Sequence, residues 1–288
     1  MNLSQHIVNG LVLGHAYALV AIGWTLLLGV ARMVNFGHGQ FYMFGAFMTW
    51  LAVEKLKLPY YVAVPFSMCA GALIGVLIQR VMLKLTLKQN LTSMMMVTLG
   101  FGLLIEGISG LSFGSSPLSI KSPLNSIDLY FGDVWLTGRD VAVMAVTIAS
   151  FAVLYWTLRF TRLGAWVRMV AEDPKLAQLG GLNVAWVYLG VFAFEGAAVA
   201  LAAAVVSPNL PILTSMGFEE LIFTFVVVIL GGVGSVLGSY VAGVGLGIFS
   251  ALFGALVSPA YTAAAAFAVL TAILVIRSAG AGNSSRGA

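Results

Sequence analysis

Charged side chains are scarce in this chain. Of its 288 residues only 8% are Asp, Glu, Lys or Arg, whereas 60% are hydrophobic. A soluble domain carries about 25% charged residues, because its surface has to be wetted. The chain could not cover a water-soluble globule with polar groups, and we find no segment that reads as a soluble domain. The composition therefore predicts a polytopic membrane protein.

Cysteine is also nearly absent, since Cys69 is the only one and lies in an apolar run. This excludes a disulfide framework and a cysteine metal site within the chain. The sequence has no paired histidines, no serine–histidine arrangement and no metal-ligand spacing, so we expect neither an enzyme nor a bound metal or other cofactor. The glycine-rich stretch 231–238 has no lysine, which excludes an ATP-binding phosphate loop and favours a tight cytoplasmic turn.

The net charge is +4, and the basic residues are scattered between the apolar spans. Their positions therefore indicate how the chain is oriented in the membrane, and they do not indicate nucleic-acid binding. Lysine and arginine are retained on the cytoplasmic side of a membrane. We therefore expect two loops to be cytoplasmic, the balanced segment 113–139 and the N-terminus to lie outside, and the C-terminus to lie inside. The basic residues behind this orientation are Arg80, Lys84 and Lys88 in one loop, Arg159, Arg162, Arg168 and Lys175 in the other, and Arg277 and Arg286 near the end.

Apolar segments recur along the chain at the length of about 20 residues that crosses a bilayer as a helix. We predict an all-α bundle of about 8–10 transmembrane helices within residues 1–277, followed by a disordered tail at 278–288. The span at 36–53 begins "NFGHGQ", whose glycines and polar side chains weaken a helix, so we expect it to be broken or to enter only partway. The predicted spans lie near 7–30, 36–53, 60–83, 91–112, 140–158, 186–206, 219–237, 239–257 and 260–277.

Several glycines have the spacing that places two small residues on one helix face, which lets neighbouring backbones approach closely in lipid. We interpret them as packing devices. These pairs are Gly10–Gly14, Gly71–Gly75 and Gly243–Gly247.

Two carboxylates, Glu106 and Glu195, fall inside predicted spans. A charge at a helix centre costs roughly 2.5–3.5 kcal/mol, so each should face the bundle interior or a water-filled path. Each side chain could contact a polar or cationic part of a substrate or move a proton, or it could be a neutral, hydrogen-bonded structural group. No arginine or lysine lies within the spans to pair with them, which predicts a neutral state or a partner on another chain.

The segment "VNFGHGQFYMFGAF", residues 34–47, is the richest polar cluster inside the predicted spans. Its side chains offer donors and acceptors, and its glycines let the backbone open. An interrupted helix near a translocation path exposes backbone dipoles that can hold a zwitterion or an amide. The alternative is an interfacial turn in which Asn35 caps the following helix. We favour the interpretation that this segment lies near a translocation path. The candidate residues of this path are Asn35, Gly37, His38, Gly39, Gln40, Glu106 and Glu195.

One short polar helix is predicted in "AEDPKLAQLGGLN". Asp173 is a good N-cap, Pro174 the favoured first residue and Gly181 a C-terminal stop, which leaves about 7 helical residues. So short a helix is barely stable alone in water, so it needs a surface to dock on. Its apolar face is too small to bind lipid strongly, which favours a protein partner over the membrane headgroups. The candidate contact residues are Arg168, Asp173, Pro174, Lys175, Ala177, Leu179 and Gly181.

Over nearly its whole length the chain resembles the permease subunits of bacterial ABC importers of the branched-chain amino acid type. "NGLVLGHAYALVAIGWTLLLGVARMVNFGHGQFYMFGAF" is similar to the N-terminal signature of that family. "RMVAEDPKLAQLGGLNV" resembles its cytoplasmic loop that couples permease to ATPase, and "FVVVILGGVGSVLGSYVAGVGLG" its glycine-rich hairpin.

The resemblance implies an inner-membrane permease subunit that pairs with a second permease subunit, expected to form a heterodimer. Two cytoplasmic ATPase subunits would dock on the coupling helices, and a periplasmic solute-binding protein would deliver a small, branched-chain amino acid. Gln40, Pro174, Leu176 and Glu195 depart from the family pattern, so urea, short amides and aromatic acids stay open as substrates. A secondary transporter working alone through Glu106 and Glu195 is the other alternative, but it gives no reason for a capped cytoplasmic helix.

Overall fold

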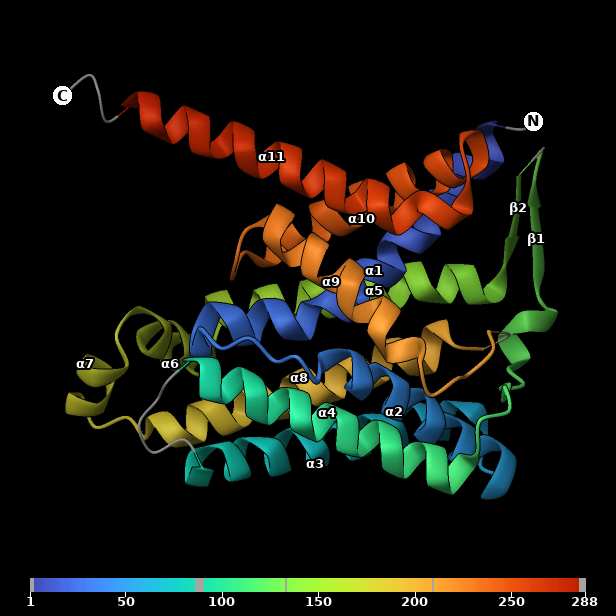
Figure 1. Ribbon diagram of the computed structural model, residues 1–288. Helices are drawn as coiled ribbons and strands as arrows, with labels where there is room; N and C mark the ends of the chain where they lie inside the picture. Colours follow the sequence, from blue (N-terminus) through green and yellow to red (C-terminus); the bar gives the residue numbers. More distant parts are fainter. Residues whose placement is uncertain (1–2, 86–90, 133, 209, 285–288) are drawn as a thin grey trace.

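The structure is a computed structural model that describes residues 3–85, 91–132, 134–208 and 210–284. Within these ranges the chain is almost entirely helical, and seven helices are long and apolar enough to cross a membrane (Figure 1). This confirms the prediction of a polytopic helical bundle. Lys88, Asp133 and Arg286 lie outside the described residues.

The described chain contains eleven α-helices, a π-helical turn, two 3-10 turns and one hairpin of two short strands. In chain order these are α1 (Leu3–Ala31), α2 (His38–Trp50), η1 (Leu51–Lys55), α3 (Tyr60–Leu85), α4 (Leu91–Phe113), η2 (Pro123–Ser126), β1 (Asp128–Phe131), β2 (Val134–Thr137), α5 (Gly138–Phe160), α6 (Arg162–Glu172), α7 (Pro174–Leu179), α8 (Val184–Val206), α9 (Met216–Gly231), α10 (Val236–Leu256), η3 (Pro259–Tyr261) and α11 (Thr262–Ser284).

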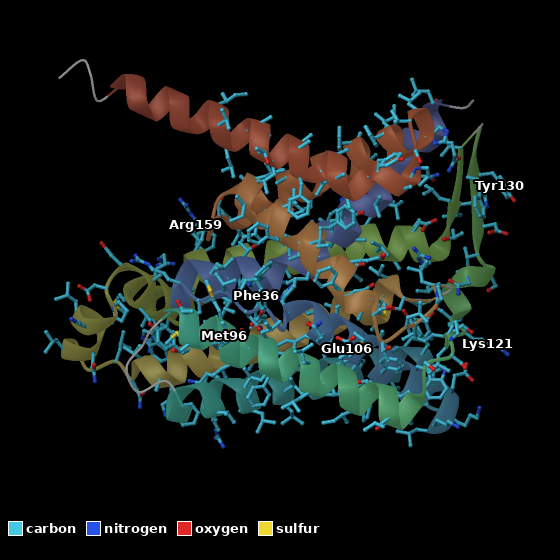
Figure 2. The ribbon with its side chains drawn as sticks, in the orientation of Figure 1. Phe36, Met96, Glu106, Lys121, Tyr130 and Arg159 are labelled. Atoms are coloured by element: carbon cyan, nitrogen blue, oxygen red, sulfur yellow. The ribbon has the colours of Figure 1, made fainter. Side chains whose placement is uncertain are left out.

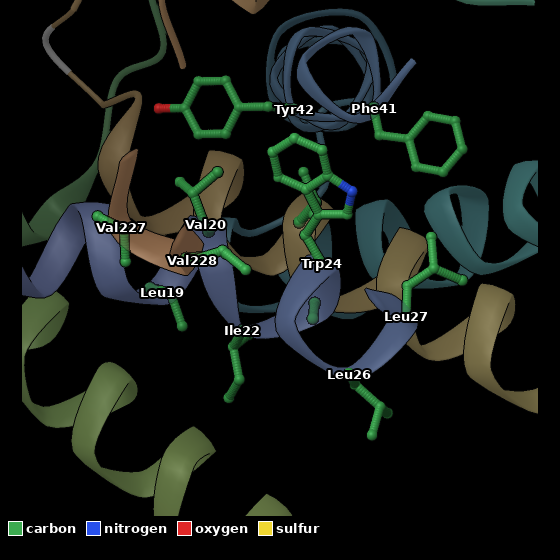
Figure 3. Close-up of a cluster of buried hydrophobic side chains, with 14 of the residues drawn as sticks. Leu19, Val20, Ile22, Trp24, Leu26, Leu27, Phe41, Tyr42, Val227 and Val228 are labelled. Atoms are coloured by element: carbon green, nitrogen blue, oxygen red, sulfur yellow. The ribbon is translucent and has the colours of Figure 1, made fainter. Parts of the chain in front are cut away.

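Helix α1 forms the centre of the bundle. It is apolar on all sides, which is the pattern of a helix buried on all sides, and from Gly14 to Ala31 nearly every residue is buried. Helices α5, α8, α9 and α10 pack around it, whereas α11 lies at the edge against α9 and α10 (Figure 1). Figure 3 shows part of this core, to which Trp24 of α1, Tyr42 of α2 and Val228 of α9 all contribute.

The glycine pairs are contact points between helix backbones, as their spacing predicts. A Cβ atom on Gly14 would lie 2.6 Å from the Cα atom of Val244, and one on Gly10 would lie 2.7 Å from that of Ile248. These contacts join α1 to α10 along the stretch that contains Gly243 and Gly247. Gly71 and Gly75 likewise bring α3 against the backbone of α8. The interpretation of these glycines as packing devices is confirmed.

Replacing Gly247 by valine should destabilise the bundle, because a side chain there would overlap the backbone of Gly14. Overpacking a well-packed interior costs about 1–3 kcal/mol, occasionally more. We expect a lower apparent Tm and less monodisperse protein after detergent extraction. Gly245→Val, on the same helix but with open space around the added Cβ, is the control. Equal thermal stability of the two variants would contradict this account of the α1–α10 contact.

One of the nine predicted spans is shorter than expected, and one is continued by a π-helical turn. The span at 36–53, which we expected to be broken or to enter only partway, is helical from His38 to Lys55, because α2 runs directly into the π-helical turn η1. In place of the span at 219–237 stands α9, whose 16 residues fall short of the about 20 that cross a bilayer. Helices α2 and α9 pack against each other where they begin, with Gly39 touching the backbone of Gly217.

The two ends of the bundle differ. Helices α6 and α7 stand at one end, and the β1–β2 hairpin stands at the other, beside the N-terminus (Figure 1). Arg159 and Lys121 mark these opposite ends in Figure 2. The hairpin was not predicted, because strands of four residues are too short to give a clear alternation. The Gln5 side chain fixes it to α1 by exchanging hydrogen bonds of 2.8 and 2.9 Å with the backbone of Trp135.

The C-terminal helix reaches further than the apolar span that predicted it. Helix α11 continues to Ser284, so helical backbone enters the segment 278–288 that we expected to be a disordered tail. Residues 285–288 lie outside the described part of the chain.

Candidate translocation site and docking helix

A buried polar cluster joins the segment before α2 to the middle of α8. The Asn35 side chain donates a hydrogen bond of 3.0 Å from Nδ2 to Oε1 of Glu195, and Nδ1 of His38 lies 2.9 Å from the same oxygen. All three side chains have an exposed fraction of 0%. We expected a neutral Glu195 or a partner on another chain, because the spans contain no arginine or lysine, but the side chain has a partner within this chain, His38.

Both ring nitrogens of His38 have partners inside the bundle. The Nε2 atom lies 3.2 Å from the backbone carbonyl oxygen of Val20, and Nδ1 faces Oε1 of Glu195. A carbonyl oxygen can only accept, so Nε2 carries a hydrogen, and a single proton between Nδ1 and Oε1 completes the other hydrogen bond. The indole ring of Trp24 stacks on the imidazole with 5.0 Å between ring centroids, which adds an aromatic contact to the cluster.

The irregular backbone of residues 32–37 sets the positions of these side chains. Oδ1 of Asn35 accepts a 2.9 Å hydrogen bond from the Gly37 amide, which closes a turn and leaves Nδ2 free for Glu195. The Phe36 amide donates to Oγ1 of Thr98 on α4 at 3.1 Å. Gly37 is the N-cap of α2, so the alternative in which Asn35 caps this helix is wrong.

The structure brings most of the predicted path residues together and leaves one apart. Gly37, Gly39 and Gln40 are buried next to the Asn35–His38–Glu195 cluster. Oε1 of Gln40 and Oε2 of Glu195 are buried without a hydrogen-bond partner. Glu106 is half-buried on α4 and takes no part in the hydrogen bonds of the cluster (Figure 2). The unpaired oxygens give the cluster unused capacity to accept hydrogen bonds.

The short polar helix α7 has the boundaries that its sequence predicts. Oδ1 of Asp173 accepts hydrogen bonds of 2.7 and 3.2 Å from the amides of Lys175 and Leu176, and Pro174 is the first helical residue. The helix has 6 residues against the expected 7 or so, and Gly181 follows with a positive φ of 85°. A capped, well-defined helix therefore stands at the end of the bundle.

Helix α7 exposes leucines to solvent. The exposed fractions of Leu176 and Leu179 are 66% and 84%, and Lys175 and Arg168 are also exposed. Ala177 instead packs into the hydrophobic core of the chain, so it anchors α7 and is not part of the exposed surface. We define the α7 surface as Arg168, Pro174, Lys175, Leu176 and Leu179.

Helix α6, which precedes α7, was missed by the sequence analysis. Its signal was readable, because Thr161 is a good N-cap and apolar and polar residues then alternate with helical period. Nη2 of Arg32, just after α1, donates a 3.1 Å hydrogen bond to the carbonyl oxygen of Ala171 near the end of α6. The platform under α7 is therefore tied to the central helix.

Comparison with known proteins places the chain among transport components. The family model described as "branched-chain amino acid transport system / permease component" matches residues 6–276. The chain is 29% identical over 290 residues to the high-affinity branched-chain amino acid transport system permease protein BraD of Pseudomonas aeruginosa, covering 96% of this chain and 94% of that protein.

Two further relatives are less similar to this chain. The high-affinity branched-chain amino acid transport system permease protein LivH of Escherichia coli is 26% identical over 297 residues, covering 96% of this chain and 94% of that protein. The ribose import permease protein RbsC of Haemophilus influenzae is 24% identical over 242 residues, covering 81% of this chain and 72% of that protein.

Proposed function

Because this chain belongs to the family of permease components of branched-chain amino acid transport systems, we propose that it carries a branched-chain amino acid across the inner membrane as part of an ATP-driven importer. The chain is a multi-pass membrane protein and a transport subunit, not an enzyme. ATP hydrolysis belongs to separate subunits. Two ATPases, a second permease subunit that completes a heterodimer, and a periplasmic solute-binding protein complete the proposed assembly.

The observation that carries the proposal is the α7 surface. Leucines with exposed fractions of 66% and 84% stand on a short, capped helix beside exposed basic side chains. Six helical residues bury too little to bind a bilayer strongly, whereas a groove on a soluble partner would cover both leucines. A push on α7 would reach α1 through the Arg32–Ala171 hydrogen bond. The helix is thus suited to transmit movement from an ATPase to the bundle.

We propose that the end bearing α7 faces the cytoplasm. Arg80, Arg159, Arg162 and Arg168 lie toward this end, and lysine and arginine are retained on the cytoplasmic side. The N-terminus and the β1–β2 hairpin then lie outside, and α11 ends inside.

The proposed path runs past the Asn35–His38–Glu195 cluster and also includes Glu106, which lies on α4 outside that cluster. The first three residues are fully buried, so the bundle is closed at this level in the conformation described. Movement of the segment before α2 away from α8 would expose Glu195 and its unpaired Oε2 atom. Because helices α2 and α9 begin here, their N-termini supply positive dipole ends near the path.

Uptake of leucine into vesicles should require this chain, its partner permease, the ATPases, ATP and the binding protein together. The measurement is accumulation of radiolabelled leucine in proteoliposomes, with one component omitted at a time. Vesicles that contain a non-hydrolysable ATP analogue are the control. Leucine uptake by this chain alone, driven by a proton or sodium gradient without ATP, would refute the proposal and support a secondary transporter.

A further inference from the structure

A cavity of about 370 Å³ lies within the bundle near the end that carries the β1–β2 hairpin. Its volume is in the range of small-molecule sites, about 300–1,000 Å³. Its walls come from α1, α5, α8, α9 and α10, and are mostly aliphatic. Its charged lining residues are Arg139, Asp140 and Glu220.

Arg139 is held in place and keeps unused donors. Its Nη1 atom donates a 3.2 Å hydrogen bond to the carbonyl oxygen of Pro208 at the end of α8, which anchors the guanidinium. Its Nε atom is buried without a hydrogen-bond partner, and the nearest carboxylate oxygen, on Asp140, is 3.9 Å away. A guanidinium is planar and matches a carboxylate with two parallel hydrogen bonds. Arg139 therefore has one long ion pair, with Asp140, and keeps donors that could bind a second carboxylate.

Of the two acidic residues, Glu220 is the one whose carboxyl group is free to accept further hydrogen bonds. Oδ2 of Asp140 accepts hydrogen bonds from the amide and hydroxyl of Thr137, at 2.9 and 2.7 Å, in the capping box of α5. Within the described residues no hydrogen bond or ion pair to the half-buried Glu220 carboxylate is formed. The cavity thus offers a guanidinium and a carboxyl group that are not paired with each other.

We propose that this cavity is the outer substrate site of the permease and binds the zwitterion of a branched-chain amino acid. Arg139 binds the α-carboxylate, Glu220 binds the α-ammonium, and Val143 and Val206 contact the aliphatic side chain. This inference rests on the proposed function and names the residues that would receive the solute.

The position of the cavity is suited to a first binding site on the proposed translocation path. Tyr17 and Val20 of α1 form part of its lining, and the carbonyl oxygen of Val20 also contacts Nε2 of His38. The cavity therefore ends one residue away from the buried Asn35–His38–Glu195 cluster. A solute released here would need that cluster to open before it could move on.

The test measures binding of radiolabelled L-leucine to the assembled importer in nanodiscs without the binding protein. Two competitors each lack one charge: 4-methylpentanoate has no ammonium, and 3-methylbutylamine has no carboxylate. For Arg139→Gln we expect leucine affinity to fall about 10- to 100-fold, since a hydrogen bond to a charged group is lost. The variant should no longer prefer leucine over 3-methylbutylamine. Glu220→Gln should show the mirror pattern and lose its preference over 4-methylpentanoate.

Lys121→Gln and Asp128→Asn are the controls, because both residues are exposed and lie in the segment 113–139 at the same end of the bundle. They should bind leucine as the wild type does. If Arg139→Gln fails to assemble, leucine binding by Arg139→Lys and Glu220→Gln is measured with the same two competitors. Wild-type affinity and competitor order in the variants, or an equal loss for leucine and both analogues, would overturn the site. If the wild-type importer nevertheless takes up leucine with ATP, the proposed function still holds. If it takes up no leucine, both the proposed site and the proposed function are refuted.

Discussion

Replacing Leu179 by aspartate should leave membrane insertion intact and abolish association with the ATPase. Leu179 is 84% exposed on α7, so the folded chain loses no internal contact when the side chain changes. A carboxylate buried in the groove of a partner would lack a counter-charge, and an unpaired buried charge costs several kcal/mol. The measurement is co-purification of ATPase with tagged permease.

The matched control is Leu56→Asp. Leu56 is 53% exposed and follows η1 after α2, at the end of the bundle remote from α7. This variant should retain a normal amount of ATPase and normal uptake. Normal recovery of ATPase with Leu179→Asp would show that α7 is not the docking helix.

Replacing Glu195 by alanine should destabilise the bundle by about 3–5 kcal/mol, because removing one member of a buried pair leaves the other unpaired. The side chains of Asn35 and His38 would both lose their shared acceptor, Oε1. The measurement is thermal unfolding in detergent, combined with leucine uptake. Glu106→Ala is the control, because this half-buried carboxylate lies outside the cluster, and we expect a smaller loss of stability.

Glu195→Gln separates structure from transport. Glutamine keeps an oxygen that accepts from Asn35 and His38, but it removes the negative charge. We expect this variant to remain folded and to lose uptake. Normal uptake would show that the charge of Glu195 has no role in transport, and equal stability of Glu195→Ala and Glu106→Ala would contradict the structural importance of the cluster.

Much of the fold could be predicted because its signals are local. A chain with few charges has to lie in lipid, and apolar segments of the right length give the long helices directly. The caps of α7 are set by neighbours in sequence, so Asp173, Pro174 and Gly181 fixed its bounds to within a residue. The glycine spacing identified the contact faces of α1, α3 and α10.

The pairing of His38 with Glu195 could not be predicted, because the two residues are separated by 157 positions and nothing local connects them. Scanning the spans for arginine and lysine missed it, since a histidine can also pair with a carboxyl group. Arg139 and Glu220 were overlooked for a related reason. Both lie near the ends of predicted spans, where charged residues are usual, and only the packing of α1, α5 and α9 gives them a common cavity.

The central place of α1 constrains how this protein is made. Helix α1 is synthesised before the helices that cover it, and its Gly10 and Gly14 contact α10, more than 200 residues later. At about 5–20 residues per second, α10 follows on the order of 10–50 s afterwards. During that interval the grooves of α1 have to be filled by lipid or by the insertion machinery. The packing of the central helix is therefore completed late in synthesis, and truncation before α10 would leave the Gly10–Gly14 face of α1 uncovered while α5, α8 and α9 still pack against it.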